Sequence, residues 1–225
     1  MLAKISAKPI RARPLDQRVR KALLLKAALR VSARRGLRAA HHTEIAREAK
    51  VSVPAVFFYF PSRAALVRDL LAEVARFFEE MAEEIHDSDR PAPEIVAAHG
   101  RAFAEAVETH PDYVCVLLEW STAIRSETWP LYLRYYEKNL ARITRTIRRW
   151  RELTASALVA DSENDARVIA ATGYVIAQMK MTRVQIEKIE RFLETVIRDT
   201  LGESPSENCK RKQTVFTKDR LRRIE

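Results

Sequence analysis

Hydrophobic side chains recur along most of the chain at intervals of three and four residues, the spacing that places them on one face of an α-helix. The clearest run follows Ser62, a suitable N-cap, and includes Leu66, Leu70 and Val74. Gly, Pro or clustered polar residues separate this run from the others. Including the run after Ser62, the pattern predicts an all-α protein of about nine helices. The other long helices are expected over 16–35, 94–109, 112–126, 127–153, 161–181 and 183–201.

Two shorter helices are predicted where the sequence reads TEIAREAKVSVPAVFFYF, over residues 43–60. Thr43 can cap a helix over 44–49, and Ser52 can cap a second over 53–59, because their hydroxyls accept hydrogen bonds from first-turn N–H groups. Two short helices joined by a tight turn are typical of a helix-turn-helix, whose second helix places its first residues in the major groove of DNA.

Charge is distributed unevenly along this pattern. The 225 residues carry a net charge of +10, yet residues 1–63 hold 15 basic and 3 acidic side chains, whereas 64–202 hold 18 basic and 23 acidic ones. A basic end on a mildly acidic body favours contact with a polyanion such as nucleic acid. The alternative is a solvated surface whose asymmetry has no function.

Composition excludes several classes of protein. Four glycines argue against Gly-rich phosphate loops and hairpin-rich barrels, and two cysteines without metal-ligand spacing argue against a disulfide scaffold. No apolar run has the length of a membrane helix, and the first residues lack the apolar segment of a secretory signal. We expect a reduced, cytoplasmic protein that has no cofactor, no metal and no membrane contact.

Several stretches resemble the TetR family of bacterial transcription regulators, in order and at matching spacing. They are ARRG at the end of the first helix, TEIAREAKVSV and VFFYFPSRAALV. The segments KPIRARP and LLEWSTAIRSETWPLY extend the resemblance to the LuxR/HapR branch of quorum-sensing master regulators, over about residues 8–135. The resemblance implies an all-α homodimer with a three-helix DNA-binding domain, followed by a larger helical domain with a ligand pocket and a dimer-forming helix pair.

Four segments are expected on this basis. Residues 1–15 would form a flexible basic arm, and 16–63 the helix-turn-helix domain. Residues 64–202 would form the helical regulatory and dimerisation domain, and 203–225 a loose basic tail.

The predicted recognition helix has an unusual outward face. If it enters the major groove, Ser52, Pro54, Ala55 and Phe58 would face the DNA while Val56 faces inward. Ala55 and Phe58 can offer only apolar or stacking contacts, for example with thymine methyl groups. Because LuxR/HapR-like proteins have Thr and Asn at these two positions, the operator of that branch is not transferred to this chain.

Other residues of the basic end are candidates for contacts with the DNA backbone. Phe60 is expected to face inward, while Tyr59 would either reach a phosphate or pack on the next helix. Basic side chains and helix N-termini position a protein on DNA without reading its sequence. Thr43, Lys50 and Arg63 are the expected phosphate contacts.

The arm and a histidine pair complete the predicted DNA-binding surface. Arg11 and Arg13 align with arginines that the branch inserts into the minor groove, where narrow A/T-rich DNA concentrates negative potential. The alternative is a disordered tail with incidental charge. His41 and His42 are expected to lie on the surface or to contact a phosphate.

The second domain offers two alternatives for its apolar residues: a packed core or a ligand cavity. The resemblance favours a cavity, and the scarcity of charge in these stripes predicts an apolar ligand with one or two polar groups. Val175 stands where the branch tends to have Cys, so the identity of the ligand is not transferred. The expected pocket residues are Phe78, Met81, Trp120, Ile124, Leu140 and Val175.

Two stripes near the C-terminal end could form either the dimer interface or core. A dimer is favoured because helix-turn-helix proteins usually bind two half-sites about one DNA turn apart. The small residues of the first stripe are Ala170, Ala171, Gly173, Tyr174 and Ala177, and the apolar residues of the second are Ile189, Leu193 and Val196.

The sequence therefore predicts a sequence-specific transcription regulator that binds a pseudo-palindromic DNA operator as a homodimer and responds to a small apolar ligand. Repression is favoured over activation because occupying a promoter is sufficient for it. The alternative is a helical protein that binds nucleic acid through charge alone. An enzyme is not expected, because the histidines have no HExxH spacing and no nucleophile partner pattern.

Overall fold

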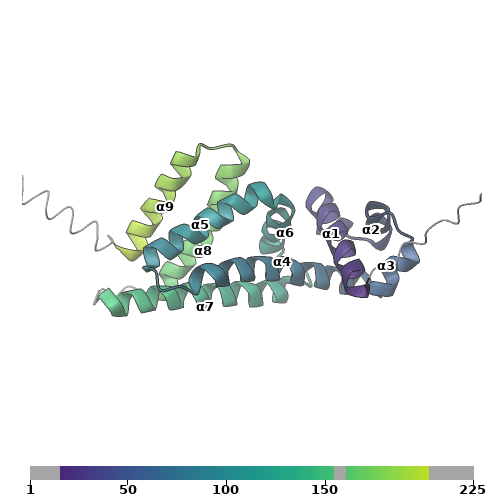
Figure 1. Ribbon diagram of the computed structural model, residues 1–225, viewed down its shortest axis with the longest axis horizontal. Coiled ribbons are helices and arrows are strands. Elements are labelled where there is room, and N and C mark those ends of the chain that lie inside the picture. Colours follow the sequence, from purple (N-terminus) through teal and green to yellow (C-terminus); the bar gives the residue numbers. More distant parts are fainter. Residues whose placement is uncertain (1–15, 155–160, 203–225) are drawn as a thin grey trace, which may run out of the picture. The chain divides into compact units, whose positions relative to one another are not determined.

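The computed structural model describes residues 16–154 and 161–202. All regular elements in these ranges are helices (Figure 1), which confirms the prediction of an all-α fold. None of the helices described is long and apolar enough to cross a membrane. Arg11, Arg13, the rest of the predicted arm and the predicted tail lie outside the described residues. The elements are α1 Gln17–Arg35, η1 Leu37–Ala39, α2 His42–Ala49, α3 Val53–Tyr59, α4 Arg63–His86, α5 Ala92–Thr109, α6 Pro111–Thr122, α7 Trp129–Thr154, α8 Ser162–Met181 and α9 Ile186–Leu201.

The chain divides into two compact units, Met1–Leu70 and Leu71–Glu225, with the boundary inside α4. In the first unit, α1 packs on α2 and α2 packs on α3. In the second unit, α8 packs against α5, α7 and α9 (Figure 1). Each unit therefore has its own set of helix contacts.

Local capping chemistry begins and ends several helices where the sequence predicts. The Asp16 carboxylate accepts from the N–H of Arg18, and the Ser62 hydroxyl accepts from the N–H of Ala65 at 3.1 Å. Gly36 ends α1 with a φ of 83°, a backbone conformation that a Cβ atom would make costly. Ser52 is the N-cap residue of α3, although its hydroxyl makes no cap bond.

Five predicted boundaries were wrong, among them the start of α7, which lies at Trp129 rather than at 127. Thr43 does not cap α2, because the helix already begins at His42 with His41 as its N-cap residue. α9 begins at Ile186 rather than at 183, since Arg183 has a φ of 59° that interrupts helical geometry. α6 ends at Thr122. α5 includes Pro93 in its first turn, a position where proline is tolerated.

The core of the first unit lies beneath α3 and between α1 and α2. Leu24, Ala28 and Val31 of the predicted α1 face are all buried. Ile45 from α2 and Val56 from α3 have no exposed surface. Small side chains in α1 and α2 let these helices approach closely.

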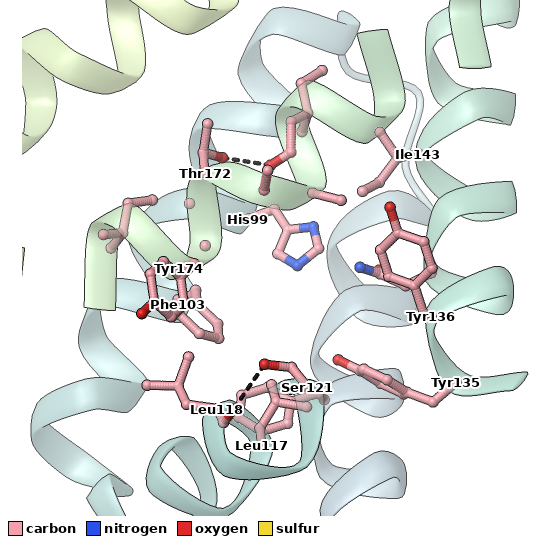
Figure 2. A pocket seen from close by; sticks show the side chains of 18 of the residues that line it. His99, Phe103, Leu117, Leu118, Ser121, Tyr135, Tyr136, Ile143, Thr172 and Tyr174 are labelled. Atoms are coloured by element: carbon pink, nitrogen blue, oxygen red, sulfur yellow. Dashed lines mark hydrogen bonds between the residues drawn. The ribbon is translucent and has the colours of Figure 1, made fainter. Parts of the chain in front are cut away.

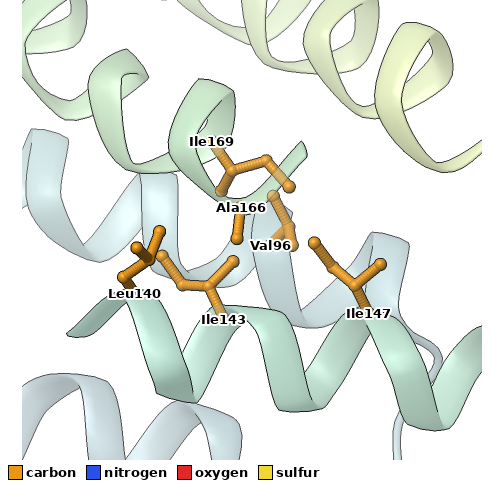
Figure 3. Close-up of a cluster of buried hydrophobic side chains, with 6 residues drawn as sticks. All are labelled: Val96, Leu140, Ile143, Ile147, Ala166 and Ile169. Atoms are coloured by element: carbon orange, nitrogen blue, oxygen red, sulfur yellow. The ribbon is translucent and has the colours of Figure 1, made fainter. Parts of the chain in front are cut away.

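The core of the second unit includes an aliphatic cluster that joins three helices (Figure 3). Val96 projects from α5, Ile143 and Ile147 from α7, and Ala166 and Ile169 from α8. Ile147 and Ala166 have no exposed surface. Burying a side chain of this size stabilises the fold by about 1.5–3 kcal/mol, so this cluster fixes how α5, α7 and α8 pack.

A polar contact beside that cluster joins α7 to α8 and α9. The guanidinium of Arg151, at the end of α7, donates from Nη1 to the Ser162 hydroxyl of α8 at 2.7 Å. Its Nη2 donates to the carboxylate of Asp165 in α8 and to the carbonyl of Thr200 in α9. One side chain thus satisfies acceptors on two neighbouring helices.

We predict that Arg151→Met lowers the free energy of unfolding by about 1–3 kcal/mol, because partly buried acceptors lose their donor. Arg167→Met is the matched control, since Arg167 pairs with Glu163 on the exposed face of α8 and such pairs contribute about 0–1 kcal/mol. Urea titrations of the two variants measure the difference. Equal losses of stability would contradict the role assigned to Arg151.

Candidate DNA-binding surface and internal cavity

The short helix α3 is held on the first unit by buried apolar side chains. Val56 in the helix and Phe60 directly after it have no exposed surface. The imidazole of His42 donates from Nε2 to the carbonyl of Phe60 at 2.7 Å, and its ring stacks on that of Phe57 with centroids 3.9 Å apart. His42 is therefore buried, and the expectation that it lies on the surface was wrong.

The opposite side of α3 carries exposed apolar surface. Phe58 is 69% exposed, and its ring meets the edge of the Tyr59 ring at 5.0 Å. Ser52 and Pro54 are exposed, and Ala55 is half-buried. Phe58 is two residues past the fully buried Val56, about 200° around the helix at 3.6 residues per turn. An aromatic ring thus stands on the outward face of a helix that begins with Ser52.

Phe57 is a second exposed aromatic residue that the sequence reasoning missed. It is 48% exposed although one face of its ring lies on His42. The adjacent pair at 57 and 58 could have been noticed, because Val56 and Phe60 already occupy the inner side of this seven-residue helix. The outward surface of α3 is therefore more aromatic than expected.

The predicted phosphate contacts differ in their surroundings. Thr43 in the first turn of α2 is exposed, as is Lys50 in the turn between α2 and α3. Arg63 is also exposed, but its Nη2 donates to the carbonyls of Leu37 and Arg38 at 3.2 and 3.4 Å. Arg63 therefore joins the start of α4 to η1, and a phosphate would have to meet its other N–H groups.

Acidic side chains of the first unit are paired with arginines of α1. The Glu48 carboxylate accepts from Nε of Arg30 at 2.8 Å and from the guanidinium of Arg34. These hydrogen bonds lower the pKa of Glu48. Glu44 accepts from Nη1 of Arg35 at 2.7 Å. Two acidic groups of this basic unit, Glu44 and Glu48, thus join α2 to α1.

The second unit encloses a cavity of about 300 Å³ between its helices (Figure 2). Phe78 of α4, one of the predicted pocket residues, lines it. Apolar walls come from α5, α6 and α8, and α7 contributes a row of tyrosines. The lining residues are Phe78, Val96, His99, Gly100, Phe103, Leu117, Leu118, Ser121, Tyr132, Tyr135, Tyr136, Asn139, Ile143, Ile169, Ala170, Ala171, Thr172, Gly173, Tyr174 and Ile176.

The other five predicted pocket residues do not line this cavity. Trp120 is 1% exposed and packed in the core, where its Nε1 donates to the carbonyl of Thr128 at 3.1 Å. Leu140 belongs to the aliphatic cluster of α5, α7 and α8. Ile124 is 65% exposed beyond the end of α6, and Val175 is 37% exposed on α8. Met81, one turn along α4, is half-buried outside the lining.

The cavity is lined instead by a stripe of residues on α7, which their spacing in the sequence could have indicated. Tyr132, Tyr136, Asn139 and Ile143 follow one another at spacings of four, three and four residues, and all line the cavity. Burial raises the pKa of Tyr132, so its phenol stays protonated. The stripe was missed because its polar members do not fit a hydrophobic pattern.

A histidine pair beside the cavity was also missed. Nε2 of His86 in α4 and Nδ1 of His99 in α5 are 2.9 Å apart, and Nδ1 of His86 is 2.8 Å from the hydroxyl of Thr146 in α7. Burial, together with the positive charge of Arg142, lowers the pKa of His86 to about 3 and that of His99 to about 4. The two rings are therefore neutral at physiological pH. No sequence spacing indicates this pair, because the two residues are on different helices.

The described residues bring together no group of three His, Cys, Asp or Glu side chains that could hold a metal ion. The cavity instead offers neutral polar groups in an aromatic and aliphatic lining. Small-molecule sites commonly combine these features, with volumes of about 300–1,000 Å³.

The first unit has the architecture of a helix-turn-helix domain, with α2, a tight turn and α3 carried on α1. Residues 24–70 match the family model described as bacterial regulatory proteins, tetR family. This part of the chain is therefore similar to that family.

The chain also resembles a curated relative in sequence and two solved structures in fold. The HTH-type transcriptional regulator LuxR of Vibrio harveyi is 40% identical over 114 residues, covering 51% of this chain and 56% of LuxR. The match thus spans little more than half the length of that relative. A TetR-like regulator from Rhodococcus sp. RHA1 aligns with a TM-score of 0.65 at 20% identity, over 84% of this chain and 100% of the other. CifR, as a cysteine mutant with 26-base-pair operator DNA, aligns with a TM-score of 0.67 at 20% identity, over 84% and 98%.

Proposed function

We propose that the protein is a sequence-specific DNA-binding transcription regulator, acting as a repressor through a homodimer on a pseudo-palindromic operator. The observation that carries the proposal is the outward face of α3, on a unit whose family model describes regulatory proteins. The chain is 40% identical to LuxR over 114 residues, and CifR was solved with operator DNA. The proposed location is the cytoplasm, and no enzymatic activity is proposed.

Base recognition by this face would be largely apolar. Phe58 and Ala55 have no hydrogen-bonding side-chain atoms, so thymine methyl groups are their natural contacts in the major groove. Ser52 is the side chain near the start of α3 that can bond a base edge or a phosphate. Thr43 and Lys50 would position the unit on phosphates. The operator should therefore contain thymines at the positions nearest Phe58.

The basic arm would add contacts outside the major groove. We propose that Arg11 and Arg13, which lie outside the described residues, enter an adjacent A/T-rich minor groove. Narrow minor grooves concentrate negative potential, which favours inserted arginines. Flanking A/T preference in the operator is the expected consequence.

We predict that selection from a random duplex library yields a pseudo-palindrome with wild-type protein, and that Phe58→Asn changes the preferred bases within each half-site. Asn replaces apolar contact with hydrogen bonding to adenine. The substitution should change the free energy of unfolding by about 0.5 kcal/mol or less, as for other surface substitutions.

Leu23→Asn is the matched control, because Leu23 is a 49% exposed apolar residue on α1. It should leave the selected sequence unchanged. Recovery of no consensus sequence would favour the alternative, a protein that binds nucleic acid through charge alone. An identical consensus for wild type and Phe58→Asn would refute recognition by this face.

The proposed dimer would use the exposed side of α8. Val168, Tyr174 and Val175 are 50%, 49% and 37% exposed, and Ala171 between them is exposed as well. An apolar stripe of this kind on a helix surface is a common mark of a protein interface. Met181, 47% exposed, continues it to the end of the helix.

Part of the predicted dimer surface is instead core within the chain. Ala177 has no exposed surface, and Ile189 and Leu193 of α9 are 1% and 3% exposed. Leu193 packs directly against α5, since a Cβ built on Gly100 would lie 2.5 Å from its Cδ2. The outward side of α9 is charged, so the apolar part of the proposed interface is on α8.

We predict that the double variant Val168→Asp and Val175→Asp is a monomer at micromolar concentration, because burying two carboxylates without partners prevents association. Wild-type protein should sediment as a dimer. Leu153→Asp serves as the control, since Leu153 is a 77% exposed apolar residue at the end of α7, and it should remain dimeric. A monomeric wild type, or a dimeric double variant, would remove the proposed interface.

The cavity supports a further part of the proposal, control by a small molecule. A ligand changes DNA affinity when it binds the DNA-competent and incompetent states with different affinities. The mainly apolar lining favours a ligand with an apolar body and one or two polar groups.

A further inference from the structure

A continuous chain of hydrogen-bonding groups leads from the core of the second unit to the cavity. It begins at the hydroxyl of Thr146, passes through both ring nitrogens of His86 and ends at His99. Thr146 and His86 are both buried, at 6% and 8% exposed. His99 is half-buried and lines the cavity, and its ring projects into the space near Phe103 and Tyr135 (Figure 2).

The position of the hydroxyl proton of Thr146 decides which group is donor and which is acceptor in each hydrogen bond of this series. In the part of the chain that the structure describes, the Thr146 hydroxyl has His86 Nδ1 as its hydrogen-bond partner and no other. Leaving a buried O–H without an acceptor costs about 1–3 kcal/mol, so the hydroxyl donates to Nδ1.

A neutral imidazole carries one proton, so His86 then carries it on Nε2 and donates to Nδ1 of His99. His99 in turn carries its proton on Nε2. This is the ring nitrogen left for the cavity, because Nδ1 is occupied by His86. His99 therefore presents an N–H donor to whatever enters.

Two hydroxyls of the wall are already engaged as donors. The Ser121 hydroxyl donates to the carbonyl of Leu118 at 2.8 Å, and the Thr172 hydroxyl donates to the carbonyl of Ile169 (Figure 2). No Asp, Glu, Lys or Arg belongs to the lining, and Arg142, whose charge acts on both histidines, is not part of it. An ionised ligand would lose its hydration without a charged side chain in the lining to pair with.

We propose that the cavity binds an uncharged small molecule with an aromatic or alicyclic body and a carbonyl-type acceptor, which receives the Nε2–H of His99. The inference rests on the proposed regulatory function for its biological purpose, but its chemistry is independent of DNA. His86 and Thr146 are positioning residues, because they fix which nitrogen of His99 carries the proton. The cavity of about 300 Å³ restricts the ligand to a small size.

The proton positions are tested first, in the full-length protein without ligand. Long-range ¹H–¹⁵N correlation spectra of the imidazoles at pH 7 distinguish the two neutral tautomers and the imidazolium. His99→Asn and His41→Asn variants assign the signals. The expected result is a neutral His99 with its proton on Nε2. A proton on Nδ1, or a positively charged ring, would overturn the proposal.

Ligand chemistry is tested with three probes of similar shape: acetophenone, ethylbenzene and benzoate. Calorimetry should show acetophenone binding at millimolar concentration or below, about 3–10-fold more tightly than ethylbenzene, the effect of one ordinary hydrogen bond. Benzoate should bind more weakly than either. Absence of acetophenone binding, no preference over ethylbenzene, or preference for benzoate would each contradict the assignment.

Two conservative variants separate positioning from packing. Thr146→Val removes the hydroxyl at nearly constant shape, so His86 can reverse its tautomer and acetophenone should lose its preference over ethylbenzene. Thr146→Ser keeps the hydroxyl and should keep both the preference and the Nε2–H signal of His99. Equal behaviour of the two variants would show that Thr146 only packs.

These measurements test the ligand chemistry of the cavity separately from the proposed regulatory function, because they are made without DNA. If acetophenone binds as expected and library selection yields no operator, the donor assignment holds and the regulatory role fails. If an operator is found and acetophenone does not bind, the reverse is true.

Discussion

Burial of Val56 and Phe60 is the constraint on which the DNA-binding surface depends. The helix α3, which follows the cap residue Ser52, has seven residues. Isolated helices shorter than about 12–15 residues are marginal in water. α3 therefore exists because its inner side is anchored, by these two side chains and by the bond from His42 to the carbonyl of Phe60. Fixing the inner side also fixes the outer side, so Phe58 must face away from the unit.

The second unit has a comparable constraint in its polar interior. An aliphatic cluster sets the packing of α5, α7 and α8, while a cavity beside it is walled by tyrosines, an asparagine and a histidine. Neutral polar groups can remain there because each either bonds within the chain or faces the open space. The Thr146–His86–His99 chain shows how one buried hydroxyl determines the chemistry that the cavity presents.

Local sequence features predicted much of the fold. Asp16 and Gly36 set the limits of α1, Ser62 begins α4, and the outward position of Phe58 follows from its angle relative to Val56. The pocket lining could not be found in this way, because it depends on which faces of α5, α6, α7 and α8 meet. The hydrophobic spacing of Trp120 and Leu140 indicates that they face inward, but it does not distinguish a pocket from the core. Packing places both residues in the core. His86 and His99 meet only in the folded chain.

The central claim is that the outer face of α3 distinguishes one base sequence from another. It is tested most directly by competition, in which a labelled duplex selected by the protein is bound at fixed salt and random duplex of equal length is added. Specific sites typically bind about 10³–10⁷-fold more tightly than non-specific ones. The account predicts that binding persists at a hundredfold excess of competitor. Loss of binding in simple proportion to the added random DNA would contradict it.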